Sequence, residues 1–362
     1  MGIKITRGKS FPIGVDLGCN VLRMAQLRSV QESLELLAAG SAPLSVSADT
    51  KGADRMNALT EAMKCVLHNG SFKGKQAIIS IPSSEAFIHH IKTPKLQGRS
   101  LVDAVRAELA NKLPYPIEQA VVRHVVAGDI PGDGEHRQEV VTVSASRTTI
   151  ENYIEIAHRA KLDVVGVNIA SCAILECYSR LFRRSEDMTR SILFLDIESD
   201  STQVVLSHGS RLAFARSLPY GTNSLDEAIG AGLNVPGDEA RRLRQVETSA
   251  QSINDDATAP LESFLDGPAD RLAGEITQCL RYCETVFKSR QAERVIFVGP
   301  EAYDKRLCQM IARKLNLPAQ VGDPLTRIRR IAGAGLEHGL DRREPQPDWS
   351  VAIGLSIGAQ AA

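Results

Sequence analysis

The sequence predicts an α/β protein of two related halves, with a small α+β unit inserted into the first half. In the first half, an apolar run ends on Asp16 and is followed by a turn and a returning strand. The same pattern recurs at 191–221, where the apolar run ends on Asp196. Between the two hairpins, residues 87–165 have their own order of strand, helix, strand, strand, helix and strand. Two similar hairpins and a unit of different texture therefore predict two facing halves and one insertion.

Length and charge exclude several classes of protein. The 362 residues are enough for two or more compact units, and Lys plus Arg equal Asp plus Glu at 43 each, so no net charge favours nucleic acid or anionic membrane. No apolar run reaches the roughly 18 residues that predict a transmembrane helix, and the basic segment Met1–Ser10 lacks the apolar core of a secretion signal. The seven cysteines show no C-x-x-C spacing, which fits buried thiols in a reducing cytoplasm.

Alternating and helical patterns predict the elements of the first half in order. Apolar and polar residues alternate at 13–17, 21–27 and 33–39, which predicts three consecutive antiparallel strands. Apolar residues at helical spacing predict a helix over 54–67. A run of β-branched residues at 76–81 predicts a buried strand.

The inserted unit is expected to begin with a strand at 87–91. Ser100 is the expected N-cap of a helix that runs through Leu113, where Pro114 stops it because proline cannot continue the hydrogen-bond ladder. The rest of the unit is expected as a hairpin of 120–126 with 139–145, a helix over 148–160 and a strand at 163–167.

The second half is expected to contain more helix than the first. Strands flank the polar turn that follows Asp196, and the longest helical pattern of the chain comes later. The expected strands are 192–195, 203–207, 211–217, 293–298 and 320–322. The expected helices are 171–183, 224–232, 238–246, 261–288, 306–315 and 349–361, with loops at 254–260 and 338–348.

Several short segments carry a resemblance to a known family. Gly14–Gly18, reading GVDLG, looks like a first phosphate loop, and Asp196 stands where a second one begins. Leu113–Glu118, reading LPYPIE, is the most distinctive match, and Pro219–Leu225 and Ala352–Leu355 complete the ordered set. Together these segments resemble the actin-like ATPase superfamily and, within it, the PilM family of type IV pilus assembly proteins. In that family, LPYPIE marks an inserted subdomain that PilM shares with the division protein FtsA.

The resemblance implies an α/β, two-lobed actin-like (ribonuclease H-like) fold. Nucleotide would lie between the lobes, and an inserted α+β subdomain of the FtsA and PilM type would lie on one flank. The implied units are the first part of lobe 1 at 11–84, the inserted subdomain at 85–165, the return of lobe 1 at 166–190, the first part of lobe 2 at 191–222, its second subdomain at 223–292 and its return at 293–362.

The resemblance also implies a site for ATP and Mg²⁺ in the cleft, with no catalytic residue assigned. Backbone N–H groups bind phosphate, and carboxylates hold the metal ion, usually through water. Asp16 and Asp196 are the implied metal ligands. The implied nucleotide-binding residues are Asp16, Gly18, Cys19, Asn20, Arg23, Asp196, Ser199, Ser201, Thr202, Gly221, Arg241, Arg244 and Gly299.

Two turns of this implied site depart from the family pattern. Glu198 stands where the second phosphate loop usually has glycine, which lets the backbone approach an anion. A carboxylate about 4 Å from a phosphate would cost on the order of 4 kcal/mol per charge pair at an effective dielectric of 20. The adenosine loop keeps Gly299 alone of three glycines and continues with Pro300 and Glu301, which remove a donor and add a charge.

Three arginines depart from the family pattern as well. Arg241 and Arg244 stand where the family has an acidic and a lysine partner of the nucleotide, and Arg23 replaces the lysine that closes the first hairpin. Arginine is long and always charged, so it does not reproduce the acceptor role of a glutamate. The departures predict a partly lost nucleotide site, at which ATP·Mg²⁺ binds weakly or not at all and efficient turnover is not expected.

By its resemblance to PilM, the chain is expected to be a cytoplasmic adaptor, peripheral to the inner face of the plasma membrane, in a type IV pilus assembly platform. It would bind the short cytoplasmic N-terminal peptide of a PilN-type bitopic membrane protein, in a groove between the first lobe and the inserted subdomain. Other platform proteins or the assembly ATPase are further expected partners. Neither nucleic-acid binding nor a membrane span is expected.

Two alternatives remain open at this stage. A GspL-type adaptor of type II secretion is related to PilM and loses nucleotide motifs, but it continues into a membrane helix, which is not expected within these residues. An enzyme of the same superfamily, such as a sugar kinase, would need a glycine-rich adenosine loop and a base Asp in the cleft, and this loop is missing. An iron–sulfur activator ATPase would need paired interface cysteines, which no pattern here indicates.

Overall fold

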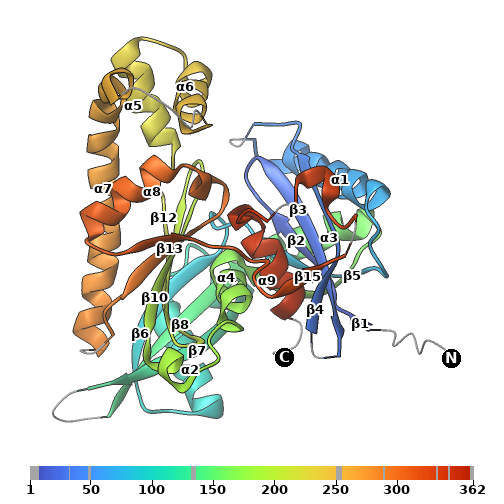
Figure 1. The fold of residues 1–362 in the computed structure, drawn as a ribbon. Coiled ribbons are helices and arrows are strands. Elements are labelled where there is room, and N and C mark those ends of the chain that lie inside the picture. The colour runs from blue at the N-terminus through green and yellow to red at the C-terminus, as the bar shows by residue number, and fades with distance from the viewer. Residues whose placement is uncertain are drawn as a thin grey trace.

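The computed structural model describes residues 8–358, apart from 32, 48–49, 132–135, 250–254, 288–289, 332 and 341–342. Two α/β lobes stand side by side, with helices α4 (Ala170–Ser179) and α9 (Ser350–Gly358) between them (Figure 1). A smaller three-stranded unit, the inserted subdomain, lies against the second lobe. The prediction of two α/β lobes and one insertion is confirmed.

Lobe 1 is built on a seven-stranded sheet in the order β15-β4-β3-β2-β5-β9, with β1 paired to β3. Ile13 and Val15 pack against α1 (Gly52–Asn69) and α3 (Arg147–Arg159) on one face, while Gly14 contacts α9 on the other, because successive residues of a strand point to opposite faces. The strands are β1 (Lys9–Ser10), β2 (Ile13–Leu17), β3 (Val21–Val30), β4 (Ser33–Pro43), β5 (Gln76–Ile81), β9 (Asp163–Ile169) and β15 (Ile328–Arg330).

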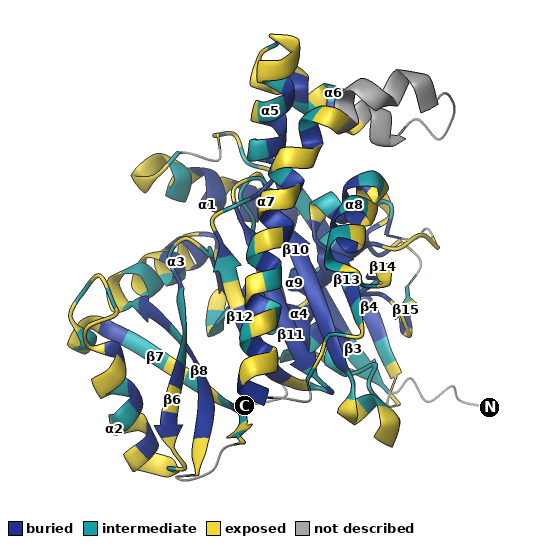
Figure 2. Ribbon diagram, turned by 90° about the vertical axis from the view of Figure 1, so that its left-hand side faces the viewer, coloured by how far each residue is buried: buried dark blue, intermediate teal, exposed yellow. Residues whose placement is uncertain are grey.

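Lobe 2 is built on a five-stranded sheet in the order β12-β11-β10-β13-β14. Leu193 and Leu195 pack in the core that α7 (Asp255–Phe287) and α8 (Lys305–Leu315) cover, whereas Phe194 faces α4 and α9. Figure 2 shows this sheet buried behind α7, which turns an exposed face outward. The remaining elements are β10 (Ser191–Ile197), β11 (Thr202–His208), β12 (Arg211–Leu218), β13 (Arg294–Val298), β14 (Ala319–Val321), α5 (Asn223–Leu233) and α6 (Gly237–Ser249).

Helices α4 and α9 cross at a point of backbone contact between the lobes. A Cβ atom added at Gly354 would overlap the carbonyl group of Ala173, which lies in α4. Glycine at position 354 therefore lets the two helices approach more closely than any side chain would allow. This crossing joins the sheet of lobe 1, on which α9 lies, to the sheet of lobe 2, on which α4 lies.

The inserted subdomain is a three-stranded sheet, β6-β8-β7, with one helix. It consists of β6 (Phe87–Pro94), α2 (Gly98–Leu109), β7 (Ala120–Ile130) and β8 (Arg137–Ser146), around a small core that includes Ile91, Leu101 and Val140. His90 fixes the unit to lobe 2. One ring nitrogen lies 3.0 Å from the carboxylate of Glu139, and the other donates to the carbonyl of Ala215 at 3.1 Å.

Three predictions about the inserted unit were wrong. The helix expected at 148–160 is α3, which packs with α1 in the core of lobe 1 and not in the inserted unit. The expected last strand of the unit is β9, which pairs in parallel with β5 and so belongs to the sheet of lobe 1. Helix α2 begins at Gly98 and ends at Leu109 instead of spanning Ser100 to Leu113, and Gln97 is its N-cap. A serine at the start of an apolar stripe thus did not mark the helix start here.

Two further differences lie in the second half. The expected loop at 254–260 is helical from Asp255 onward as part of α7, and Pro260 lies inside that helix, while residue 254 lies outside the described residues. Strand β15 was not predicted, because three residues are too few to show a period. It pairs in parallel with β4 and extends the sheet of lobe 1.

Candidate functional site

The two expected metal ligands occupy equivalent places in the two lobes. Asp16 is the last residue but one of β2, and Asp196 is the last residue but one of β10. Each strand turns into an antiparallel neighbour directly afterwards. The two residues are 8% and 2% exposed, respectively. The hairpins that look alike in sequence therefore bring two buried carboxyl groups to the cleft between the lobes.

The loops after these strands touch each other across the cleft. The thiol of Cys19 donates to the Glu198 carboxylate at 3.2 Å and lies 3.3 Å from an Asp200 carboxylate oxygen. The amide of Asn20 donates to the Ser199 hydroxyl at 2.8 Å. Residues that were expected to bind phosphate thus bind the opposite loop instead.

The space left between Asp16 and the second loop is small. A cavity of about 30 Å³ remains between Asp16, Ser80 and Glu198. One water needs roughly 10–15 Å³ when measured in this way, so the cavity has room for about two waters and none for a triphosphate. The side chain of Glu198 turns into the cleft, where it accepts a hydrogen bond from the Cys19 thiol. It occupies the space that a glycine at this position would leave open.

Three carboxyl groups crowd this cleft, and each pKa is raised. Burial, helped by the charge of Glu198, raises the pKa of Asp16 from its ordinary value of 3.8 to about 7. Burial and the charge of Glu198 raise the pKa of Asp196 well above its usual range, and burial raises the pKa of Glu198 itself. The closed cleft therefore binds protons that an unfolded chain would release.

The residues present fit a small hard cation better than they fit a nucleotide. Asp16 and Asp196 offer the oxygen ligands that Mg²⁺ prefers. Oδ1 of Asp196 has no hydrogen-bond partner among the described residues, although it is buried. Mg²⁺ would be held by these two carboxylates and would offset the crowding of negative charge. The cavity volume, in contrast, does not admit the phosphates of ATP in this arrangement of the lobes.

We expect the stability of the protein to fall as the pH rises from about 4 to about 7. The folded state binds more protons than the unfolded state in this window, because the pKa of Asp16 is about 7 when folded and 3.8 ordinarily. Below the window both states are protonated, and the loss levels off above it. A shift of this size corresponds to about 4 kcal/mol at most. Denaturant midpoints measured at pH 5 and pH 8 test the prediction.

Asp16→Asn should reduce this pH dependence, because an amide does not titrate, while Asp196 and Glu198 still do. Asp54→Asn is the matched control, since Asp54 is exposed at the start of α1 and lies outside the crowded cleft. Asp16 would not be the cause if the wild type and the Asp16→Asn variant lost stability equally between the two pH values.

Two arginine side chains hold the first loop and its hairpin. Arg55 was not predicted to do so, and Arg23 was expected at the nucleotide. The guanidinium of Arg55 donates to the carbonyls of Gly18 and Cys19, at 3.1 to 3.2 Å. Arg23, which was expected to meet nucleotide, instead forms an ion pair of 2.9 Å with Asp348. Both contacts join segments far apart in the sequence, and no local pattern indicated either one.

The second loop is also bound by the protein itself. The hydroxyl of Ser201 lies 3.2 Å from that of Ser83, and the hydroxyl of Thr202 donates to the Tyr220 carbonyl at 2.7 Å. Gly221 packs directly on the backbone of Glu198 and Ser199, where a Cβ would overlap both residues. The polar groups of this loop therefore make contacts within and between the lobes.

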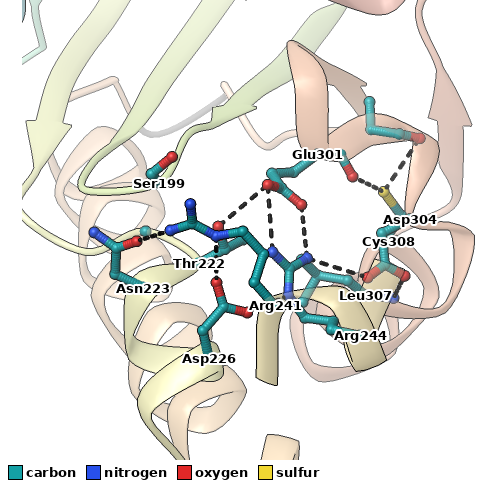
Figure 3. Close-up of polar contacts among 12 residues, drawn as sticks. Ser199, Thr222, Asn223, Asp226, Arg241, Arg244, Glu301, Asp304, Leu307 and Cys308 are labelled. Atoms are coloured by element: carbon teal, nitrogen blue, oxygen red, sulfur yellow. Dashed lines mark hydrogen bonds and ion pairs between the residues drawn. The ribbon is translucent and has the colours of Figure 1, made fainter. Parts of the chain in front are cut away.

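Two of the three arginines of α6, Arg241 and Arg244, form an ion-pair network with other elements of lobe 2 (Figure 3). Nε of Arg244 lies 2.7 Å from the Asp226 carboxylate, and its Nη1 lies 2.7 Å from Glu301. The side chain of Arg244 is 1% exposed. Arg241 is half-buried and binds the other oxygen of Asp226 at 3.1 Å and the side-chain oxygen of Asn223 at 2.9 Å.

Gly299 is retained for a steric reason that the structure makes plain. Its φ angle is +77°, and an added Cβ would overlap Oδ1 of Asp196. Its N–H donates to the carbonyl of Pro347 at 2.9 Å. The glycine therefore lets the turn after β13 pass close to the buried carboxylate, while Glu301 two residues later faces Arg244.

The structure gathers most of the expected site residues at the cleft but pairs them with each other or with residues not expected there. Cys19 and Asn20 meet the second loop, and Arg241 and Arg244 meet α5. The missed partners are Arg55, Asp226, Asp304 and Asp348. No pattern in the sequence indicated that Arg241 and Arg244 share Asp226.

The actin-like ATPase fold consists of two α/β lobes with helices crossing between them. In each lobe an Asp stands at the end of the equivalent strand, here Asp16 in β2 and Asp196 in β10. A family model described as type IV pilus assembly protein PilM matches residues 14–360. The chain therefore belongs to the PilM family of type IV pilus assembly proteins, as the ordered motifs indicated. A search of curated proteins found no match.

Solved structures support the same fold. The PilM–PilN type IV pilus biogenesis complex has a chain similar to this one, with a TM-score of 0.78, 19% identity and coverage of 96% of this chain and 97% of that chain. The ethanolamine utilization protein EutJ from Carboxydothermus hydrogenoformans is similar with a TM-score of 0.54 and 13% identity, over 96% of this chain and 89% of that one. MreB5 of Spiroplasma citri, solved with ADP bound, is similar with a TM-score of 0.53 and 11% identity, over 98% and 97%.

No helix within the described part of the chain is both long enough and apolar enough to span a membrane.

Proposed function

We propose that the chain is a cytoplasmic adaptor of a type IV pilus assembly platform. It binds the short N-terminal cytoplasmic peptide of a PilN-type bitopic membrane protein and is held at the inner face of the plasma membrane by that contact. Membership of the PilM family supports the pilus context, and the similar solved chain comes from a complex described as PilM–PilN. The observation that carries the proposal is an apolar groove between lobe 1 and the inserted subdomain.

The groove has the size and chemistry of a peptide site. Its volume is about 340 Å³, within the range of about 300–1,000 Å³ that is usual for ligand sites. Val143 of β8 lines the wall from the inserted subdomain, and Val167 of β9 lines it from lobe 1. Arg123, His124 and Asn168 are the polar groups at its surface. Apolar walls with a few polar groups suit apolar peptide side chains on a polar backbone.

The strands beside the groove favour an extended peptide. Strand β7 is the edge of the sheet of the inserted subdomain, and β9 is the edge of the sheet of lobe 1. An edge strand offers unpaired backbone groups to an added strand. Val125 on β7 is 46% exposed and Val165 on β9 is 52% exposed, so both edges present apolar side chains that a partner would cover.

We expect Val125→Asp to weaken binding of the partner peptide by at least about tenfold, which is about 1.4 kcal/mol of binding free energy. The peptide would have to bury the new carboxylate against apolar groups, which is unfavourable. Val125 lines the groove and is already exposed, so the change should not disturb folding. Fluorescence polarisation with synthetic N-terminal peptides of candidate bitopic partners measures the affinity.

Leu336→Asp is the matched control, because Leu336 is 55% exposed and does not line the groove. The control should bind the peptide as tightly as the wild type. Failure of every peptide to bind the wild type would contradict the adaptor function, and an equal loss in both variants would move the peptide site elsewhere.

A further inference from the structure

We propose that Arg244 takes the place of a nucleotide in this chain, so that α6 is held against the turn after β13 without ATP, while the two loops that face each other across the cleft bind each other. The inference goes beyond peptide binding, because it concerns what occupies the nucleotide site that the fold implies. It rests on the disagreement between the nucleotide that the fold implies and the contacts that fill its site.

The guanidinium of Arg244 makes contacts with three acidic residues from two sides. Asp226 of α5 lies 2.7 Å from its Nε, and Glu301 of the short helix Pro300–Tyr303 lies 2.7 Å from its Nη1 and 3.4 Å from its Nη2. Asp304, the N-cap of α8, lies 3.6 Å from Nη1. One side chain therefore joins α5 and α6 to the turn between β13 and α8.

Burial shows that this network is part of the folded core. The side chain of Arg244 is 1% exposed, and those of Asp226 and Glu301 are 5% and 14% exposed. An arginine that is nine-tenths or more buried is stable only when its charge is paired. Burial alone would lower the pKa of Arg244, but the hydrogen bonds and charges of Glu301 and Asp226 raise it overall. The cation is thus permanent and held in place.

Two of the departures from the family pattern, Arg244 and Glu301, bind each other. Glu301 follows the single retained glycine of the turn, and Arg244 stands on the facing helix. Each would be an obstacle to a nucleoside alone, whereas together they form a bidentate pair. Figure 3 shows the guanidinium of Arg244 pointing at the carboxylate of Glu301, with Asp304 and Cys308 behind it. Because the two side chains are complementary, we infer that a structural ion pair occupies the adenosine site.

The phosphate end of the cleft is closed in the same way. Cys19 binds Glu198 and Asn20 binds Ser199, so that each loop fills the space in front of the other. Glu198 is another departure from the family pattern, and it too makes a contact within the protein. Protein atoms at both ends thus make the contacts that would otherwise be available to a nucleotide.

Titration of ATP·Mg²⁺ and ADP·Mg²⁺ in a calorimeter tests the proposal. The wild type should show no saturable heat, which places its Kd above about 1 mM. The double variant Arg244→Ala with Glu301→Gly should gain at least about tenfold in affinity, because it removes both obstacles at the adenosine end and places a glycine at 301, although Glu198 still fills the phosphate end. Arg242→Ala is the matched control, since Arg242 is exposed on the same helix, and it should behave as the wild type.

Hydrogen exchange of residues 237–245 in the wild type gives a second readout that does not depend on any variant. Protection of this segment should be high without nucleotide and unchanged when ATP·Mg²⁺ is added. Low-micromolar binding of ATP by the wild type, or protection that appears only with ATP, would overturn the proposal. Neither result would bear on peptide binding, which the Val125→Asp experiment tests separately.

Discussion

Arg244→Ala is expected to lower the free energy of unfolding by about 3–5 kcal/mol, the usual cost of removing one partner from a buried ion pair. The change leaves Asp226 and Glu301 without the cation that lies 2.7 Å from each of them. Asp226, which is buried and keeps Arg241 at 3.1 Å, and Glu301, which is partly buried, would then repel each other at neutral pH. Urea denaturation followed by circular dichroism measures the loss.

Arg242→Ala serves again as the matched control and should change stability by less than about 0.5 kcal/mol, as exposed substitutions usually do. A triple change of Arg244 to Met, Asp226 to Leu and Glu301 to Leu should recover much of the loss, because apolar side chains of similar volume can replace a buried ion pair. Equal stability of the Arg244→Ala variant and the wild type would show that the network contributes nothing to folding.

Gly354→Ala is expected to cost about 3 kcal/mol or more, although alanine is normally the better helix former. The added Cβ would overlap the carbonyl of Ala173, which belongs to the backbone of α4 and cannot rotate away. Overpacking usually costs about 1–3 kcal/mol, and contact between two backbones leaves the least room for relaxation. Thermal unfolding should therefore begin at a lower temperature than in the wild type.

The matched control for this prediction lies on the same helix. A Cβ added at Gly358 would make only an ordinary contact at 3.6 Å with the side chain of Glu176. Gly358→Ala should be neutral or stabilising by up to about 1 kcal/mol, because alanine is favoured over glycine in helices. If both alanine variants behaved alike, the closeness of α4 and α9 would not be the determining factor.

The fold could be predicted because the sequence contains long segments with a clear hydrophobic period and a set of motifs in a characteristic order. Strands 13–17 and 76–81 agree with the structure residue for residue. The strand at 163–169 could be recognised as a strand but was assigned to the wrong sheet, because pairing between β5 and β9 depends on segments far apart in the sequence. Periodicity reports what one segment does and does not identify its partner.

The site could be predicted by position and only in part by chemistry. Asp16 and Asp196 do lie at the ends of equivalent strands, and Glu198 does enter the cleft. The sequence showed that Arg244 and Glu301 each depart from the family pattern, but it could not show that they bind each other. Taken separately, the two departures predicted a lost nucleotide site. Their geometry indicates that an ion pair stands in the place of the nucleotide.

Strand β15 has a consequence for the order in which the chain folds during synthesis. It pairs with β4, and α9 covers β2, so lobe 1 takes part of its edge and one whole face from residues 328–358. A ribosome makes these residues after all the other described segments, so the nascent first lobe has an open strand edge and a bare apolar face until then. Chaperone binding to nascent chains should therefore persist until these residues have emerged.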